Sequence, residues 1–237
     1  MKIVLRCLQC GDKSPDTLVS LELEDTGVYS VTCPLGHHSI QTLSIHKFAL
    51  LFELGLLALG DGYTREAVAS FAASAEEFYR FSIKCILARR GLYEGDLYFE
   101  AKKLWKVIPR AEPQLGAFVA LYFLEFKEVA LYPDRESLEF RNAVIHRGRI
   151  PKSGEVNNFG QKLLDFMVPA YKRFRKGFEA LTAMGIDAIE KLEHHDPNVP
   201  RGGSYRPVAV DFLALQEEEP TFTVALEYAR KRSFLEA

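Results

Sequence analysis

The chain has 237 residues, of which 48% are hydrophobic and 26% are charged, and its formal net charge is −2. This composition is typical of a soluble globular protein with one large core, or with a main domain and a small module. The slightly negative net charge excludes a generally basic surface, so binding to a nucleic acid would require a local basic patch.

The apolar runs are too short for a membrane-spanning helix, which needs about 20 apolar residues. The longest run, FALLFELGLLALG from Phe48, is interrupted by Glu53. The first ten residues, MKIVLRCLQC, lack the apolar stretch and the cleavage site of a signal peptide. We therefore expect a cytoplasmic protein without a membrane segment.

Residues 1–45 have the pattern of short strands. The runs KIVLR, LVSLELE and VYSVT are rich in β-branched and apolar residues, and the turn-forming clusters GDKSPD and EDTG separate them. The segment LVSLELEDTGVYSVTC predicts a hairpin with Gly27 in its turn. We therefore expect a small β-rich module at the beginning of the chain.

This module carries cysteine and histidine residues at the spacing of metal ligands. Cys7 and Cys10 form a C-x2-C pair, and Cys33 and His37 form the ends of C-P-x-G-H. Tetrahedral zinc binds four thiolate or imidazole ligands, and two such knuckles supply them with little strain. The segment resembles a zinc ribbon. Because so small a module has little core, bound Zn²⁺ would hold it folded.

Alternatives to this ligand set are an accidental cluster, a disulfide between Cys7 and Cys10, and His38 in place of His37. The lack of an export signal argues against a disulfide. We prefer His37 because it completes the knuckle that contains Gly36. A site with four protein ligands leaves no open position, so the predicted zinc is structural and not catalytic.

From about residue 45 to residue 192 the pattern becomes helical. Apolar and small residues recur at spacings of three and four, which predicts a long helix at 64–90. Further helices are predicted at 46–59, 114–131, 134–147 and 157–184, with loop and short helix at 91–113 and a final helix from about 221. The predicted fold is mainly α, with a zinc ribbon at 1–45, a helical bundle at 46–192, and a loop and C-terminal extension at 193–237.

The helix predicted at 134–147 ends in FRNAVIHRG, residues 140–148. Asn142 and His146 are one turn apart on the same face, and the long side chain of Arg141 can reach around toward them. Gly148 is a typical end for a helix. Three polar residues therefore meet at one helix terminus.

This segment resembles the R-x4-6-H motif of the HEPN superfamily, whose members are helical bundles and include many ribonucleases of toxin and defence systems. The position also matches, because the motif comes late in the predicted bundle, after a helix that contains Glu76 and Glu77. The resemblance covers residues 46–186. It implies a homodimer in which the motifs of both protomers face each other, and it allows for an antitoxin or another regulatory protein as partner.

The residue types suit RNA cleavage without a metal ion. The 2′-hydroxyl of RNA is the nucleophile, and an imidazole can transfer the proton near neutral pH. A guanidinium donates to the phosphoryl oxygens, where negative charge develops. The predicted catalytic residues are Arg141, His146 and Asn142, the last of which would orient the histidine or contact the phosphate.

Two neighbouring segments are candidates for binding RNA. Arg147, Arg149 and Lys152 directly follow the motif, but they are equally well explained as a solvated loop. In YKRFRKGF, Tyr171 and Arg173 are candidates for stacking and for phosphate contacts. A helix with one apolar and one charged face is the alternative. His46, His194 and His195 lack companions at ligand spacing and are expected on the surface.

Other functions compete with the ribonuclease. Arginine, asparagine and histidine near a helix C-terminus also cap carbonyl groups and complement the helix dipole. A HEPN-like bundle that only binds RNA, a nucleotide or a protein is the main alternative, and a purely structural helical protein is the third. Motifs for P-loop nucleotide hydrolysis, dinucleotide binding and zinc proteolysis are absent from the sequence.

Overall fold

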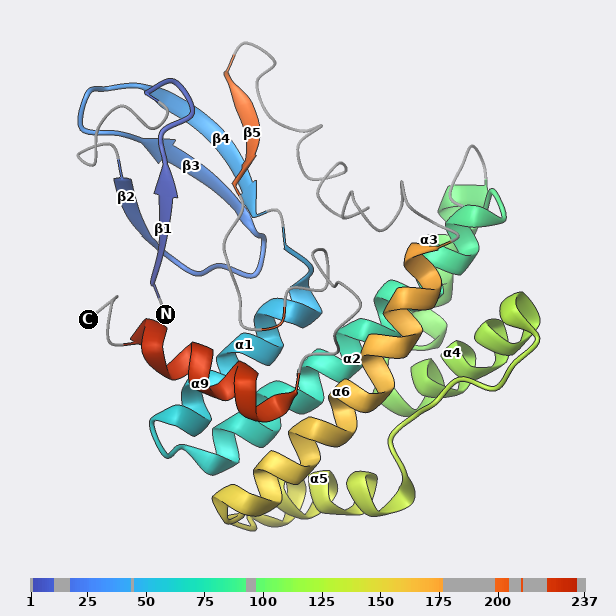
Figure 1. Cartoon of the computed structure of the whole chain (residues 1–237). Helices are drawn as coiled ribbons and strands as arrows, with labels where there is room; N and C mark the ends of the chain where they lie inside the picture. The colour runs from blue at the N-terminus through green and yellow to red at the C-terminus, as the bar shows by residue number, and fades with distance from the viewer. Residues whose placement is uncertain are drawn as a thin grey trace. The chain divides into compact units, whose positions relative to one another are not determined.

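The structure is a computed structural model of the chain (Figure 1), and it describes residues 2–10, 18–43, 45–92, 97–176, 199–204, 210 and 221–233. The chain divides into two compact units. The first contains Met1–Ile45 and Ala183–Pro207, and the second contains His46–Thr182 and Val208–Ala237. The described elements are mainly helices, with strands in the first unit, which confirms the predicted fold class.

The first unit is built from two small sheets. Strand β1 (Lys2–Arg6) pairs with β2 (Leu18–Glu22) in an antiparallel manner, with Ile3 opposite Leu21. Strand β3 (Val28–Thr32) pairs antiparallel with β4 (His38–Leu43), and β5 (Arg201–Ser204) adds to β4 in parallel. The late strand β5 therefore completes a sheet that begins more than 150 residues earlier in the sequence.

The predicted hairpin around Gly27 is wrong in its pairing. The strands before and after Gly27, β2 and β3, exist, but they belong to different sheets. Gly27 does adopt the positive φ of +61° that a tight turn requires. The hairpins join β1 to β2 and β3 to β4 instead, and each of the two cysteine knuckles therefore lies after the first strand of a hairpin.

The second unit is a helical bundle. Its described helices are α1 (Lys47–Gly60), α2 (Thr64–Arg89), α3 (Leu97–Val107), α4 (Ala111–Phe126), α5 (Arg135–Arg147), α6 (Ser153–Arg175) and α9 (Phe222–Ser233). None of the described helices has the length and apolar character that a membrane-spanning segment requires.

The helix boundaries differ most from prediction in α4 and α6. Helix α4 begins three residues earlier than predicted, at Ala111. It also ends earlier, at Phe126, because Lys127 adopts a left-handed conformation with φ of 60° and closes it. Helix α6 begins four residues earlier, at Ser153, because the Glu155 carboxylate accepts a hydrogen bond of 2.9 Å from the Lys152 N–H and caps the first turn. The predicted end of α6, at 184, lies outside the described residues.

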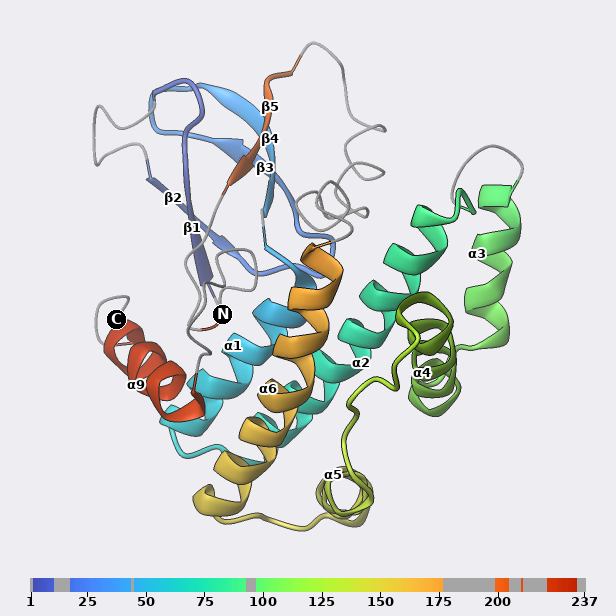
Figure 2. The same cartoon turned by 45° about the vertical axis from the view of Figure 1, so that its right-hand side comes forward.

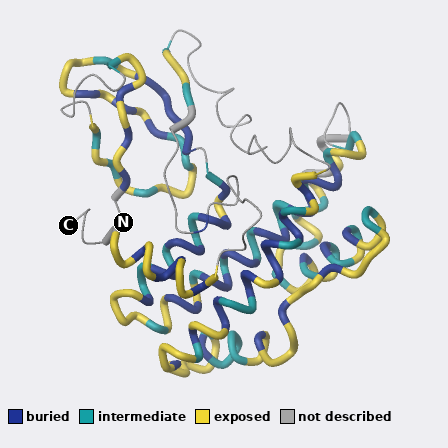
Figure 3. Tube along the Cα trace, viewed as in Figure 1, coloured by how far each residue is buried: buried dark blue, intermediate teal, exposed yellow. Residues whose placement is uncertain are grey.

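The long helix α2 is the centre of the bundle. Helices α1, α4, α5 and α6 all pack against it (Figures 1 and 2). Figure 3 shows buried positions recurring along α2 and α6, as the spacing of their apolar residues predicts. Apolar side chains such as Phe71 and Phe78 are fully buried there and contribute most of the burial energy.

Helix α9 joins this bundle and is not an isolated extension. It packs against α1 and α6, and Phe222 lies so close to Gly160 that a Cβ at that glycine would stand 2.0 Å from the ring. Residues 193–237, predicted as a loop and C-terminal extension with a final helix, thus supply β5 to the first unit and α9 to the second.

Candidate functional sites

The predicted metal ligands come together in the first unit. The ligand atoms of Cys7, Cys10, Cys33 and His37 lie within 4.8 Å of one another. His37 Nδ1 is 3.1 Å from Cys10 Sγ and 3.8 Å from Cys7 Sγ, and the Sγ atoms of Cys10 and Cys33 are 4.0 Å apart. Around tetrahedral zinc, with Zn–S bonds of about 2.3 Å, neighbouring sulfurs are about 3.8 Å apart. The four residues could therefore hold a metal ion.

Backbone geometry directs these ligands inward. In the second knuckle the Cys33 N–H donates to the His37 carbonyl at 3.0 Å, and the Gly36 N–H donates to the Cys33 carbonyl at 2.9 Å. Gly36 has φ of +82°, a conformation that glycine adopts without strain. His38 is excluded from the cluster because its Nε2 lies 2.9 Å from Ser30 Oγ. Cys7 and Cys10 are not joined by a disulfide.

The thiol groups themselves favour a cation at this position. Burial, and then the neighbouring thiols of Cys7 and Cys33, raise the pKa of Cys10 to about 11. At Cys7, by contrast, burial is outweighed by backbone hydrogen bonds from Cys10 and Gln9, which lower the pKa of the thiol. A bound metal ion would offset the repulsion between the sulfurs, because it binds cysteine as thiolate. The donor set, two buried thiols with one thiol and one imidazole that are partly buried, suits a closed structural site.

In the second unit, α5 positions the Arg141 motif. Its N-cap is Asp134, whose carboxylate accepts a hydrogen bond of 2.7 Å from the Ser137 N–H. Lys162 of α6 donates to the same carboxylate at 3.0 Å. The hydrogen bonds from Ser137, together with Lys162, lower the pKa of Asp134 to about 2. At the other end, Gly148 has φ of +71° and terminates the helix as predicted.

Arg141 is held by two partners in its own chain. Its Nη2 forms an ion pair with the Glu76 carboxylate of α2, and its Nη1 donates to Asn142 Oδ1 at 2.9 Å. The side chain is 18% exposed, so the guanidinium is anchored but not sealed. A guanidinium has five N–H donors, and those not used by Glu76 and Asn142 can serve a ligand.

His146 lies in the last turn of α5 and is exposed to solvent. Within the described part of the chain it has no hydrogen-bond or ion-pair partner. The Asn142 Oδ1 accepts a hydrogen bond from Arg141, a contact that was not predicted, and Asn142 makes no hydrogen bond to His146 within the described residues. The imidazole is therefore available to an incoming ligand, while the guanidinium is fixed in place.

The basic residues after the motif differ from one another. Arg147 is exposed and has no ion-pair partner among the described residues. Arg149 forms an ion pair with Glu155, and its guanidinium carbon stands 5.3 Å from the centre of the Phe140 ring. Lys152 is exposed at the start of α6. Of the two arginines, only Arg147 lacks such a contact with another described residue.

The expectation that Tyr171 stacks on an RNA base is wrong, and so is the surface position expected for His46. Tyr171 is fully buried, and its hydroxyl lies 2.9 Å from Nε2 of the buried His46. A base cannot reach a ring that other rings enclose, among them Phe48 and Phe81. Arg173 is exposed but forms an ion pair of 3.2 Å with Glu128. His194 and His195 lie outside the described residues.

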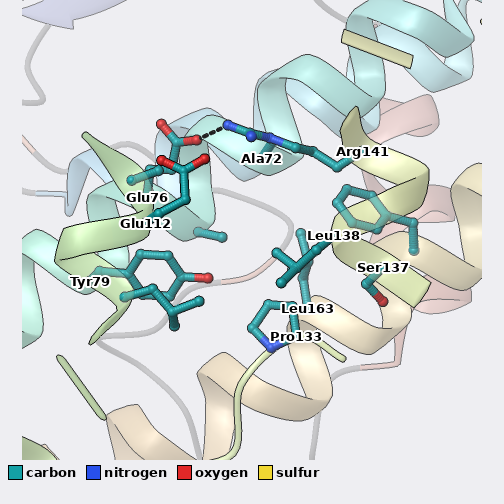
Figure 4. Close-up of a pocket in the computed structure, with 13 residues that line it drawn as sticks. Ala72, Glu76, Tyr79, Glu112, Pro133, Ser137, Leu138, Arg141 and Leu163 are labelled. Atoms are coloured by element: carbon teal, nitrogen blue, oxygen red, sulfur yellow. Dashed lines mark hydrogen bonds and ion pairs between the residues drawn. The ribbon is translucent and has the colours of Figure 1, made fainter. Parts of the chain in front are cut away.

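A pocket that the sequence did not predict lies beside Arg141 (Figure 4). It is formed by α2, α4, α5 and α6 and has about 490 Å³ of space, counting the solvent in its mouth. Its walls are mostly apolar. Its polar side chains are Glu76, Tyr79, Glu112, Ser137 and Arg141. No sequence pattern links these residues, because they come from different helices.

Comparison with known proteins found no matching family model, no matching curated protein and no matching solved structure. The resemblance to the HEPN superfamily therefore depends on the Arg141–His146 motif and on its place in the helical bundle.

Proposed function

We propose that the protein is a metal-independent endoribonuclease of HEPN type, with Arg141, Asn142 and His146 as its catalytic residues. The observation that carries this proposal is the arrangement at the end of α5. Glu76 and Asn142 hold the Arg141 guanidinium in place, and His146, on the next turn, is exposed and unpaired among the described residues.

In the proposed reaction the 2′-oxygen of a ribose attacks the adjacent phosphorus, and the bond from phosphorus to the 5′-oxygen breaks. One imidazole accepts the 2′-hydroxyl proton, and a second donates a proton to the leaving 5′-oxygen. Arg141 donates to the phosphoryl oxygens, where charge develops. The products are a 2′,3′-cyclic phosphate and a free 5′-hydroxyl.

The proposed reaction uses one imidazole as general base and a second as general acid, and each chain offers one His146. We therefore propose a homodimer in which each protomer supplies half of the site. Two copies of Arg141 would also provide the positive field that a net charge of −2 does not. Light scattering of the purified protein should give a mass of two chains.

The first unit is proposed to be a zinc ribbon whose Zn²⁺, bound by Cys7, Cys10, Cys33 and His37, has a structural role. It would dock RNA or a partner protein, while the chemistry takes place in the helical unit. An antitoxin or another regulatory protein is the partner that a toxin or defence role would require.

The test is incubation of the purified protein with labelled RNA in EDTA. We expect cleavage that leaves cyclic phosphate ends, with rates at least about 100-fold lower for His146→Ala and Arg141→Ala. His38→Ala is the matched control, because it removes an exposed histidine that belongs neither to the proposed catalytic residues nor to the cysteine and histidine cluster. Equal cleavage by His146→Ala would show that a contaminating or different nuclease activity is responsible.

The ion pair between Glu76 and Arg141 favours a second candidate, a HEPN-like module that binds RNA without cleaving it. A carboxylate already neutralises the guanidinium in the free chain, so part of its charge is unavailable to a phosphate. RNA that stays intact at every protein concentration while it binds, with weaker binding by Arg141→Ala, would select this candidate over the nuclease.

A further inference from the structure

The pocket beside Arg141 has the composition of a site for a flat ligand with a polar edge. Its walls include the apolar side chains of Leu115, Leu138, Phe159 and Leu163, and they come from α4, α5 and α6. Apolar walls with a few polar groups are typical of pockets for small ligands. The faces of a planar ring fit such walls.

The Tyr79 hydroxyl, which lines this pocket, lacks a partner. Tyr79 is 4% exposed, and its hydroxyl has no hydrogen-bond partner among the described residues. Buried polar groups are normally paired, so unpaired ones at a pocket indicate a missing ligand or water. Burial, and then the nearby Glu76 carboxylate, raise the pKa of Tyr79, so its hydroxyl stays protonated and can donate.

The charged groups of the pocket lie along one side. Figure 4 draws Glu76, Glu112 and the Arg141 guanidinium there, with the Tyr79 hydroxyl directed toward Leu138 and Leu163. Glu112 is exposed and has no ion-pair partner within the described part of the chain. Carboxylates only accept hydrogen bonds, so this side of the pocket suits a ligand edge that carries N–H donors.

We infer that this pocket binds a nucleobase, with preference for guanine, of a nucleotide whose phosphate contacts Arg141. Guanine presents two adjacent donors, N1–H and the 2-amino group, whereas adenine, cytosine and uracil each present one donor group on that edge. Glu112 and the oxygen of Glu76 that faces away from Arg141 accept these donors, and the Tyr79 hydroxyl donates to a ring or carbonyl acceptor. This assignment rests on the proposed function, because it names the base next to the phosphate that Arg141 would bind.

The binding test uses the full-length His146→Ala protein, so that the result does not depend on catalysis. Calorimetric titration with the 3′- and 5′-monophosphates of guanosine, adenosine, cytidine and uridine should give at least about tenfold tighter binding of one guanosine nucleotide, the effect of one hydrogen bond to a charged group. Failure of both guanosine nucleotides to bind, or equal affinity for all four bases, overturns the assignment.

Two added substitutions locate the binding. Tyr79→Phe and Glu112→Gln should each weaken guanosine nucleotide binding by about tenfold. Their matched controls are Tyr122→Phe, a buried tyrosine that bonds to Glu128, and Glu139→Gln, an exposed acid on α5 that does not line the pocket. Thermal denaturation shows that each variant is folded. Binding unchanged by both pocket substitutions would place the nucleotide elsewhere and refute the inference.

The wild-type protein separates this inference from the nuclease proposal. RNA cleavage next to guanosine supports both. Cleavage without preference for any base keeps the nuclease and overturns the base pocket. Intact RNA with selective guanosine binding that Tyr79→Phe weakens refutes the nuclease and assigns the pocket to a binding module.

Discussion

The guanidinium of Arg141 on α5 is paired with the carboxylate of Glu76 on α2, 65 residues earlier in the chain. Both side chains are partly exposed, so solvent weakens the attraction. A double-mutant cycle with Glu76→Gln and Arg141→Gln should give a coupling energy of about 0.5–1 kcal/mol in urea unfolding. Additive effects of the two substitutions would show that the pair is not formed in solution.

The capping interaction at Asp134 predicts a pH-dependent stability. The pKa of Asp134 is lowered to about 2 in the folded state, so its charged carboxylate stabilises the fold above pH 4. This contribution is lost as the pH falls from about 4 to 2. Asp134→Ala should lower the free energy of unfolding by about 1 kcal/mol near neutral pH and by less at pH 2. Fluorescence of Trp105, the sole tryptophan, reports unfolding of the helical unit. An equal loss at both pH values would contradict the capping role.

The contact between Tyr171 and His46 predicts the effect of removing a single hydroxyl group. Tyr171→Phe removes the hydroxyl that lies 2.9 Å from His46 Nε2 but keeps the buried ring. We expect a loss of about 1 kcal/mol in the free energy of unfolding, with RNA binding unchanged. Tyr228→Phe, at an exposed tyrosine, is the control. A loss of RNA binding without a loss of stability would restore a surface role for Tyr171.

The contact between α6 and α9 predicts opposite effects at two glycines of α6. Gly160→Ala places a methyl group 2.0 Å from the Phe222 ring, so Phe222 must move, and we expect a destabilisation of about 1–3 kcal/mol. Gly154→Ala meets no atom within 4 Å and should leave stability unchanged or raise it by up to about 1 kcal/mol. Thermal melts of both variants test this. Equal melting temperatures would mean that α9 is not docked on α6.

The cysteine and histidine cluster predicts metal-dependent folding of the first unit. Elemental analysis should find one bound metal ion per chain, and zinc is the metal we expect. Cys33→Ser or a strong chelator should abolish protection from proteolysis in residues 1–45, whereas Ser30→Ala, which removes the partner of His38, should not. A metal-free protein in which this segment resists protease would refute the site.

Much of this molecule follows from local patterns in the sequence. The C-x2-C and C-P-x-G-H knuckles identify a potential metal site because ligand spacing within a tight turn is a local property. The spacing of apolar residues likewise locates α2, and Asp134 and Gly148 mark the ends of α5, since capping depends on neighbouring residues.

Tertiary structure decided what local patterns cannot express. The pairing of β4 with β5, the burial of His46 against Tyr171, and the ion pair of Arg141 with Glu76 each join residues far apart in the sequence. The sequence neighbours of a polar or aromatic residue do not show whether its side chain lies in the core or on the surface. Only the packing of helices around α2 determines which ones are buried, and the same packing creates the pocket beside Arg141.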